Sequence, residues 1–343
     1  MRRLTWLPLV LATACGDNIR LAPLDAAADA TPDATPDAPP DAPGPDHWQP
    51  IFDEVDRARL VQLVTDMAHE RYSDAGRAQF RAYWTQYMTA LGLTVTTLDY
   101  PASGNIMHRQ RAGTDLEAVL AGPSPDSVVV IVHYDSIGPM GSETDNPGAD
   151  DDMTGMAIEL ETARILVEHR AELAYTVRFV ASDGEELGAL SGAVAYGRSL
   201  KAAALAGGFH VIAAIDDEQS GWNCHADGAC ATAAWPTYDV FTCDAPTNTQ
   251  FSYPALGDQL AAITAAYSPL AVTRGCLGPN SDHYAMWAAG FPAIVFSEHD
   301  PFDNNHFDQG GGDTVDKLDT DYLTMIARPT ITFAASVAGI PRY

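Results

Sequence analysis

Residues 127–133 read SVVVIVH, a run of β-branched apolar residues that ends in a polar group. Such a run is typical of a strand buried on both faces of a parallel sheet. Around it, apolar spacing predicts helices over 60–67, 74–91, 153–169 and 187–200, and strands over 93–98, 105–110, 175–181, 209–215 and 292–296. Strands that alternate with helices predict an α/β fold with a mostly parallel central sheet covered on both faces. In such folds ligands bind at the carboxyl ends of the strands.

The composition excludes several classes of protein. The chain has 343 residues, 46% of them hydrophobic, which is enough for a large core and excludes a wholly disordered chain. With 19 Lys and Arg against 46 Asp and Glu, the formal charge is -27, the wrong sign for a nucleic-acid partner. The longest apolar run lies at the N-terminus and is too short to cross a bilayer, which excludes a polytopic membrane protein.

The first residues predict export. Arg2 and Arg3 precede an apolar stretch over 4–14, and small residues stand directly before Cys15. This pattern resembles the lipobox of bacterial lipoproteins, in which the cysteine is acylated, so residues 1–15 are expected to be a signal peptide. The membrane would then be contacted only through a lipid anchor. Ordinary cleavage and secretion, or a buried apolar segment, are the alternatives.

Residues 16–46 predict a disordered tether, because Asp-Ala units recur there between prolines and no core can form. Residues 47–343 contain no second linker and are expected to form one domain. Within it, residues 217–253 lack clear periodicity and are predicted to be an insertion over the site.

Chemistry-bearing residues follow the predicted strands. His133 and Asp135 end one strand on the same side, so the carboxylate can receive the second N–H of the imidazole. Asp150, Asp151 and Asp152 stand at the start of a helix, where three adjacent carboxylates repel one another unless a cation lies among them. Taken singly, a buried histidine and helix-capping aspartates explain these residues equally well.

Further carboxylates come from the next two strand ends. Glu185 and Glu186 follow one strand, and in that turn one can ligate a metal while the other faces the substrate as a general base. Asp216 follows the apolar run VIAAI, with a solvated loop as the alternative explanation. Repeated acidic and histidine-rich strand ends favour a metal-dependent hydrolase.

The motifs together resemble the co-catalytic zinc peptidases of clan MH, which include secreted bacterial leucyl aminopeptidases, glutamate carboxypeptidases and, more distantly, glutaminyl cyclases. The resemblance rests on VHYDS (132–136), PGADDDMTG (147–155), DGEELG (183–188), SDHYAMWAAGFPAIVFSE (281–298), the acid after VIAAI, and a histidine before DTVDKLD. It implies a three-layer α/β/α sandwich around a mixed, mostly parallel central sheet. It also implies two Zn²⁺ ions.

The resemblance implies a role for each site residue. One zinc would be held by His133 and Asp216 and the other by Glu186 and His306, with Asp151 bridging both. Asp135 would orient His133, and Glu185 would be the general base. Residues 281–283 would support the site without ligating.

Two departures from the family pattern affect this assignment. A glycine-rich stretch follows His306, so His299 competes with it as a ligand. Asn305 stands where some relatives have a tyrosine, so the metals would have to stabilise the oxyanion.

The predicted activity is that of an aminopeptidase acting on peptide or aminoacyl substrates, because an acidic pocket suits a free ammonium group. A glutaminyl cyclase or carboxypeptidase of the same superfamily is one alternative. A non-catalytic lipoprotein that binds calcium through carboxylates is another, although the two histidines argue against it.

Four cysteines remain after Cys15, and an even number in an exported chain predicts two disulfides. The preferred pairing is Cys224–Cys230 with Cys243–Cys276. A zinc site made from these thiols and His225 is the alternative.

Overall fold

The computed structural model describes residues 48–102, 111–137, 146–186, 190–224, 237–241 (main chain only), 253–275, 281–299 and 312–340. The predicted signal peptide, the predicted tether and the predicted strand over 105–110 lie outside these ranges. The strands are β1 (Thr94–Tyr100), β2 (Gly113–Leu120), β3 (Ser124–His133), β4 (Tyr175–Ser182), β5 (Val211–Glu218), β6 (Thr237–Phe241), β7 (Ala271–Gly275) and β8 (Ala293–Glu298).

The helices are α1 (Gln49–Glu54), α2 (Arg57–Met67), α3 (Asp74–Ala90), α4 (Met153–Glu168), α5 (Ser191–Gly207), α7 (Pro254–Tyr267), α8 (Asp282–Ala289) and α10 (Thr320–Val337). Two short 3₁₀ helices are η2 (Arg170–Glu172) and η4 (Val315–Lys317). Among the described helices, none is both long and apolar enough to cross a membrane.

The strands form one mixed sheet in the order β1-β2-β4-β3-β5-β8-β6-β7. Among the described strands, four of the seven pairings are parallel, and these include β4 with β3, β3 with β5 and β5 with β8. The centre of the sheet is therefore parallel, which confirms the α/β prediction.

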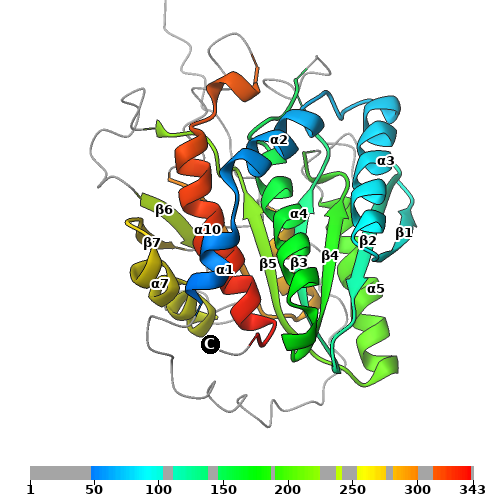
Figure 1. Ribbon diagram of the computed structural model, residues 1–343. Helices are drawn as coiled ribbons and strands as arrows, with labels where there is room; N and C mark the ends of the chain where they lie inside the picture. Colours follow the sequence, from blue (N-terminus) through cyan, green and yellow to red (C-terminus); the bar gives the residue numbers. More distant parts are fainter. Residues whose placement is uncertain are drawn as a thin grey trace, which may run out of the picture. The chain divides into compact units, whose positions relative to one another are not determined.

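Helices cover both faces of the sheet (Figure 1). α2, α3, α4 and α10 pack with one face in a core that includes Phe80, Trp84 and Phe333. α5 and α8 pack on the other face with Val129, Ile131 and Val180 of the central strands. Residues 127–133 are buried throughout because alternate side chains of β3 enter the two cores.

Two local features explain where helices start. α2 begins because Asp56 accepts the N–H of Ala58 at 2.8 Å, and its apolar side is buried. α5 begins at Ser191, later than the predicted 187, after Leu190 with a positive φ of 47°.

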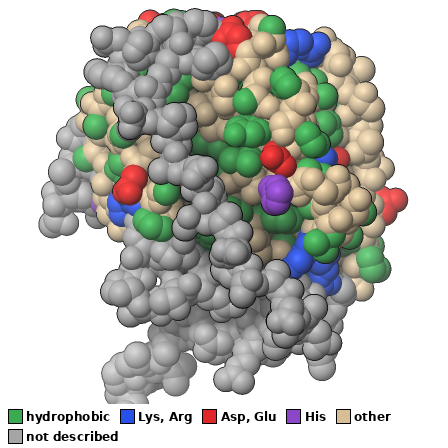
Figure 2. Space-filling view, turned by 90° about the horizontal axis from the view of Figure 1, so that it is seen from below, with side chains coloured by type: hydrophobic (Ala, Val, Ile, Leu, Met, Phe, Trp, Pro, Cys, Tyr) green, Lys and Arg blue, Asp and Glu red, His purple; other side chains and the backbone are tan. Residues whose placement is uncertain are grey.

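Figure 2 views the molecule from the end where the central strands β3, β4 and β5 begin. Red and blue side chains lie scattered there among hydrophobic and other ones. The negative charge of the chain therefore does not gather on this face in the part that the structure describes.

Candidate active site

The central parallel strands end side by side, and polar side chains occupy those ends. His133 ends β3 and is paired with Ser182 at the end of β4. On the other side, Ile131 of β3 is paired with Asp216 of β5, which continues to Glu218. Two more residues along each strand bring Glu218 level with His133.

His133 is the centre of a group of three possible metal ligands. Its Nε2 lies 3.0 Å from Oδ1 of Asp151 and 3.7 Å from Oε1 of Glu218. One ligand atom from each residue lies within 4.8 Å of the others. We call these three residues the His133 group.

The His133 group fits a metal ion. The His133 side chain is buried, and in the described part of the chain neither of its nitrogens nor Oδ1 of Asp151 has a partner with hydrogen-bond geometry. Buried polar atoms normally have partners, so Nε2 of His133 and Oδ1 of Asp151 are left for a ligand, while Nδ1 of His133 faces Asp135. Imidazole and carboxylate oxygens are donors that zinc accepts.

The three adjacent aspartates make different contacts. Asp152 caps α4, because its Oδ1 accepts the N–H of Gly155 at 3.0 Å. Oδ1 of Asp150 accepts the N–H of Gly221 at 2.7 Å. Asp151 is the one of the three that faces His133, and the peptide bond between Asp151 and Asp152 is cis. Asp151, the predicted bridging residue, thus belongs to the His133 group. Asp150 and Asp152 instead accept hydrogen bonds from the main chain.

Two residues, Asp313 and Arg71, hydrogen-bond to the main chain in and around the turn that contains Asp151. The carboxylate of Asp313 accepts the N–H groups of Asp150 at 2.9 Å and Asp151 at 2.8 Å. The buried guanidinium of Arg71 donates to the carbonyl oxygens of Tyr134 at 2.6 Å and Gly148 at 2.9 Å, and also to that of Pro147. Neither residue has a role that the sequence predicts, because contacts with main-chain groups leave no signal in the residue types.

Asp135 lies beside His133, as predicted, and also holds the next turn. Its Oδ1 is 3.6 Å from Nδ1 of His133 and accepts the N–H groups of Gly184 and Glu185 at 2.9 and 3.0 Å. Arg111 contacts its other oxygen at 3.2 Å. Burial raises the pKa of Asp135, but His133 and Arg111 outweigh it, so the pKa is lowered and the carboxylate stays charged.

Glu185 and Glu186 follow β4 and are only partly covered. Oε1 of Glu186 accepts the N–H of Ile137 at 3.0 Å. Burial, together with the charges of Glu218 and Asp151, raises the pKa of Glu185 well above its usual value. Burial and Asp151 do the same to the pKa of Glu186. The charges of Asp151 and His133 thus act on the pKa of both glutamates, as expected for neighbours of one site.

The predicted end of the strand before Asp216 is wrong, whereas the role of Asp216 as a ligand stays a prediction. β5 runs to Glu218 rather than ending at residue 215. Asp216 therefore lies two residues before the end of the strand. Its Oδ2 accepts the N–H of His283 at 2.8 Å and lies 3.1 Å from Nδ1 of that residue. Glu218, not Asp216, belongs to the His133 group, and its Oε2 accepts the hydroxyl of Ser281 at 2.7 Å.

Some of the remaining predicted residues lie outside the described ranges. His306 lies outside the described residues. Its competitor His299 follows β8, and its main-chain N–H donates to the hydroxyl of Tyr322 at 3.0 Å. Cys224 is disulfide-bonded; Cys230, Cys243 and Cys276 lie outside the described residues, so the pairing stays a prediction.

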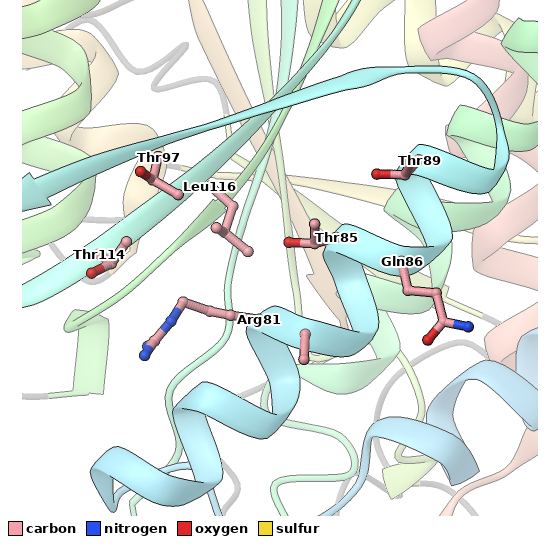
Figure 3. Close-up of a pocket in the computed structure, with 8 residues that line it drawn as sticks. Arg81, Thr85, Gln86, Thr89, Thr97, Thr114 and Leu116 are labelled. Carbon is pink, nitrogen blue, oxygen red and sulfur yellow. The ribbon is translucent and has the colours of Figure 1, made fainter.

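A separate hollow lies between α3 and the strands β1 and β2 (Figure 3). Its volume is about 470 Å³, and its lining includes Arg81, Thr85, Thr97, Thr114 and Leu116. None of its lining residues belongs to the His133 group.

Together, the fold and the donor set define the class of α/β metallopeptidases. The model of peptidase family M28 matches residues 116–334, and this chain belongs to that family.

Comparisons with single proteins agree with this assignment. Leucine aminopeptidase 1 of Coccidioides posadasii is 27% identical over 228 residues, which cover 64% of this chain and 55% of the relative. The crystal structure of LapB from Legionella pneumophila superposes with a TM-score of 0.65 at 20% identity, covering 86% of this chain and 75% of that one. Glutaminyl cyclase of Fimbriiglobus ruber gives 0.62 at 18% identity, covering 81% and 94%. The structural likenesses show the fold, and the chain spans about half the length of the curated relative.

Proposed function

We propose that this protein is a zinc-dependent aminopeptidase that removes N-terminal residues from peptides with the help of two zinc ions. The observation that carries the proposal is the convergence of His133, Asp151 and Glu218 in a chain of peptidase family M28. The similarity to a leucine aminopeptidase supports action at the amino end of the substrate.

In this proposal His133, Asp151 and Glu218 hold one ion, and Asp151, Glu186 and His306 hold the other. Bound zinc supplies Lewis acidity, which polarises the scissile carbonyl and makes water a stronger acid. Asp135 fixes the ring of His133 so that Nε2 faces the ion.

Glu185 is the proposed acid–base group. It takes a proton from the attacking water and returns it to the leaving amine, so the proton rests on its carboxylate between the two steps. Asp135 fixes the main chain of Glu185 through its N–H.

The charge of the site does not by itself select the substrate. Asp151, Glu185, Glu186 and Glu218 carry four negative charges when ionised, which two divalent ions would balance. The preference for a free ammonium group therefore rests on the similarity to a leucine aminopeptidase.

The deciding experiment combines metal analysis of the purified chain with a panel of aminoacyl anilides, assayed with and without a chelator. Two zinc ions per chain and chelator-sensitive anilide release are expected. Stoichiometric calcium without zinc, together with no turnover, would refute the proposal.

A glutaminyl cyclase is the second candidate, since a solved cyclase shares the fold. Peptides with N-terminal glutamine distinguish the two activities. An aminopeptidase shortens them by one residue, whereas a cyclase releases ammonia and leaves their length unchanged.

We propose further that the protein is exported and anchored to the cell envelope by acylation of Cys15. The support is the sequence pattern before that residue. Replacement of Cys15 by Ser should release the protein from the membrane fraction, as measured by detergent partitioning.

A further inference from the structure

Arg111 lies just before β2, and its guanidinium joins two buried carboxylates. One terminal nitrogen, Nη2, donates to Oδ2 of Asp135 at 3.2 Å and to Oδ1 of Asp183 at 3.1 Å. The other, Nη1, donates to the carbonyl oxygen of Tyr72 at 2.8 Å, and the guanidinium carbon lies 5.3 Å from the centre of the Tyr72 ring. Both carboxylates are buried, whereas 18% of the Arg111 side chain is exposed. The guanidinium is therefore fixed by three hydrogen bonds and a ring contact.

The two carboxylates follow the two strands that lead into the site. Asp135 follows β3, and its Oδ1 lies 3.6 Å from Nδ1 of His133. Asp183 follows β4 and stands two residues before Glu185, the proposed acid–base group. The same Oδ1 of Asp135 accepts the main-chain N–H of Glu185 at 3.0 Å, which joins the two segments once. Arg111 joins them a second time, through the side chains.

The second connection restricts the rotation of the Asp135 carboxylate. In the described part of the chain, the hydrogen bond to Oδ2 of Asp135 comes from Arg111. A carboxylate free to turn about its last bond would change its contacts with His133 and with the N–H of Glu185 together. Asp135 and Asp183 are also like charges, and the positive charge of Arg111 attracts both. Loss of Arg111 would therefore release both contacts of Oδ1 from their present geometry.

We propose that Arg111 is a positioning residue that sets the place of Glu185 relative to His133. This inference rests on the proposed function and adds a residue that acts through Asp135 and Asp183. Neither carboxylate is a proposed ligand, so zinc in excess should still fill the site when Arg111 is replaced. Loss of a residue that orients a metal ligand typically lowers activity by about 10- to 100-fold. A shift of about 1 Å in a reacting group has a similar effect on the rate.

The test measures release of an aminoacyl anilide by the full chain in excess zinc, with zinc content and thermal unfolding measured on the same samples. Arg111→Met keeps much of the length of the side chain and removes its donors. It should keep the wild-type zinc content, lower kcat by about 10- to 100-fold and leave KM within about threefold. A loss of kcat at unchanged zinc content is the signature of misplacement rather than of an empty site.

Arg178→Met is the matched control. Arg178 of β4 donates to Oε1 of Glu117 at 2.9 Å, its guanidinium carbon lies 5.2 Å from the centre of the Phe209 ring, and 19% of its side chain is exposed. The control thus loses the same kinds of contact at the same degree of burial, beside residues that have no proposed role in the site. Its kcat should stay within about twofold of the wild-type value.

Two further measurements separate positioning from a loss of stability. Guanidinium ion added to Arg111→Ala should restore part of kcat, because it can fill the space of the missing group and donate to both carboxylates. Sodium ion at the same ionic strength should not. Arg111→Lys keeps the positive charge, but one ammonium nitrogen cannot reproduce the planar fork of the guanidinium. Its kcat should therefore lie between those of the wild type and Arg111→Met.

The outcomes separate this inference from the proposed function. If Arg111→Met folds with the wild-type kcat, if its loss lies in KM alone, or if Arg178→Met loses as much, this inference is wrong and the proposed function stands. Equal restoration by sodium and guanidinium ions also contradicts it. If Arg111→Met does not fold, Arg111→Lys decides, and a wild-type kcat in that variant overturns the inference. If the wild-type chain binds no zinc and releases no anilide, both are wrong.

Discussion

The carboxylate of Asp313 accepts the main-chain N–H of Asp151 at 2.8 Å, although 162 positions separate the two residues in the sequence. The N–H of Asp313 in turn donates to Oδ1 of Asn146 at 2.8 Å, just before the same turn. Asp313 also follows the segment that contains His306. The turn that carries the predicted ligand Asp151 is therefore hydrogen-bonded to a residue that follows another predicted ligand, His306, in the sequence.

Replacement of Asp313 by alanine should lower both stability and zinc affinity. It leaves the buried N–H of Asp150 and the partly buried N–H of Asp151 without their acceptor, at a cost of about 1–3 kcal/mol for the buried group and less for the other. Asp313→Asn keeps one acceptor and should be milder. Thermal unfolding with and without zinc measures both effects. The exposed neighbour Asp316 is the control position, and an equal loss in Asp316→Ala would contradict the prediction.

Glu218 and Asp216 can be distinguished by metal content. Glu218→Ala should abolish or strongly reduce binding of the ion at His133, because it removes one of the three donors. Asp216→Asn should keep that ion, since the amide oxygen can still accept the N–H of His283. Zinc analysis after dialysis against a weak chelator measures both. Retention of zinc by Glu218→Ala and its loss from Asp216→Asn would restore the original ligand assignment.

The adjacent glutamates Glu185 and Glu186 should fail in different ways. Glu185→Gln should retain both metals and lower kcat by about 10²- to 10⁴-fold with little change in KM, because only proton transfer is lost. Glu186→Ala should lower metal occupancy. Steady-state kinetics with parallel metal analysis tests this. An active Glu185→Gln enzyme would remove Glu185 from the role of base.

Glu159 of α4 gives a pH-dependent stability that involves no metal. It is fully buried beside Trp84, and burial raises its pKa to about 8. The unfolded chain ionises this carboxyl near its ordinary value of about 4.3. The neutral form therefore gives full stability below that value, and stability falls as the pH rises toward 8.

Glu159→Gln should remove this loss, which is of the order of a few kcal/mol. Urea unfolding at pH 5, 7 and 8.5 should show that the advantage of the variant grows with pH. The exposed Glu168→Gln is the control. An advantage that is the same at each pH would show that the ionisation of Glu159 does not limit stability.

The centre of the fold was predictable because its strands are buried on both faces. The run over 127–133 is apolar from Val128 to Val132, and the strand over 175–181 has a single charged residue, Arg178, so the ends of both strands could be recognised. Some outer elements, such as α10 and β6, were not assigned. α10 contains Pro329 and a β-branched stretch, which hide its helical pattern, and β6 lies within the segment interpreted as an insertion.

The end of β5 shows the limit of strand-end prediction. Three acids follow the apolar run, and the sequence gives no signal for where pairing stops. The partner strands set that point, because Glu218 is still paired with Ser297 of β8. A shift of two residues keeps the same face of the strand but changes which carboxylate reaches His133.

Arg71 and Asp313 secure the turn around Asp151 through main-chain groups of the protein itself. Because these hydrogen bonds join protein groups only, they require no bound metal, unlike the fold of a zinc finger. Substitutions at Arg71 or Asp313 are therefore expected to change where Asp151 lies while every residue of the His133 group is kept.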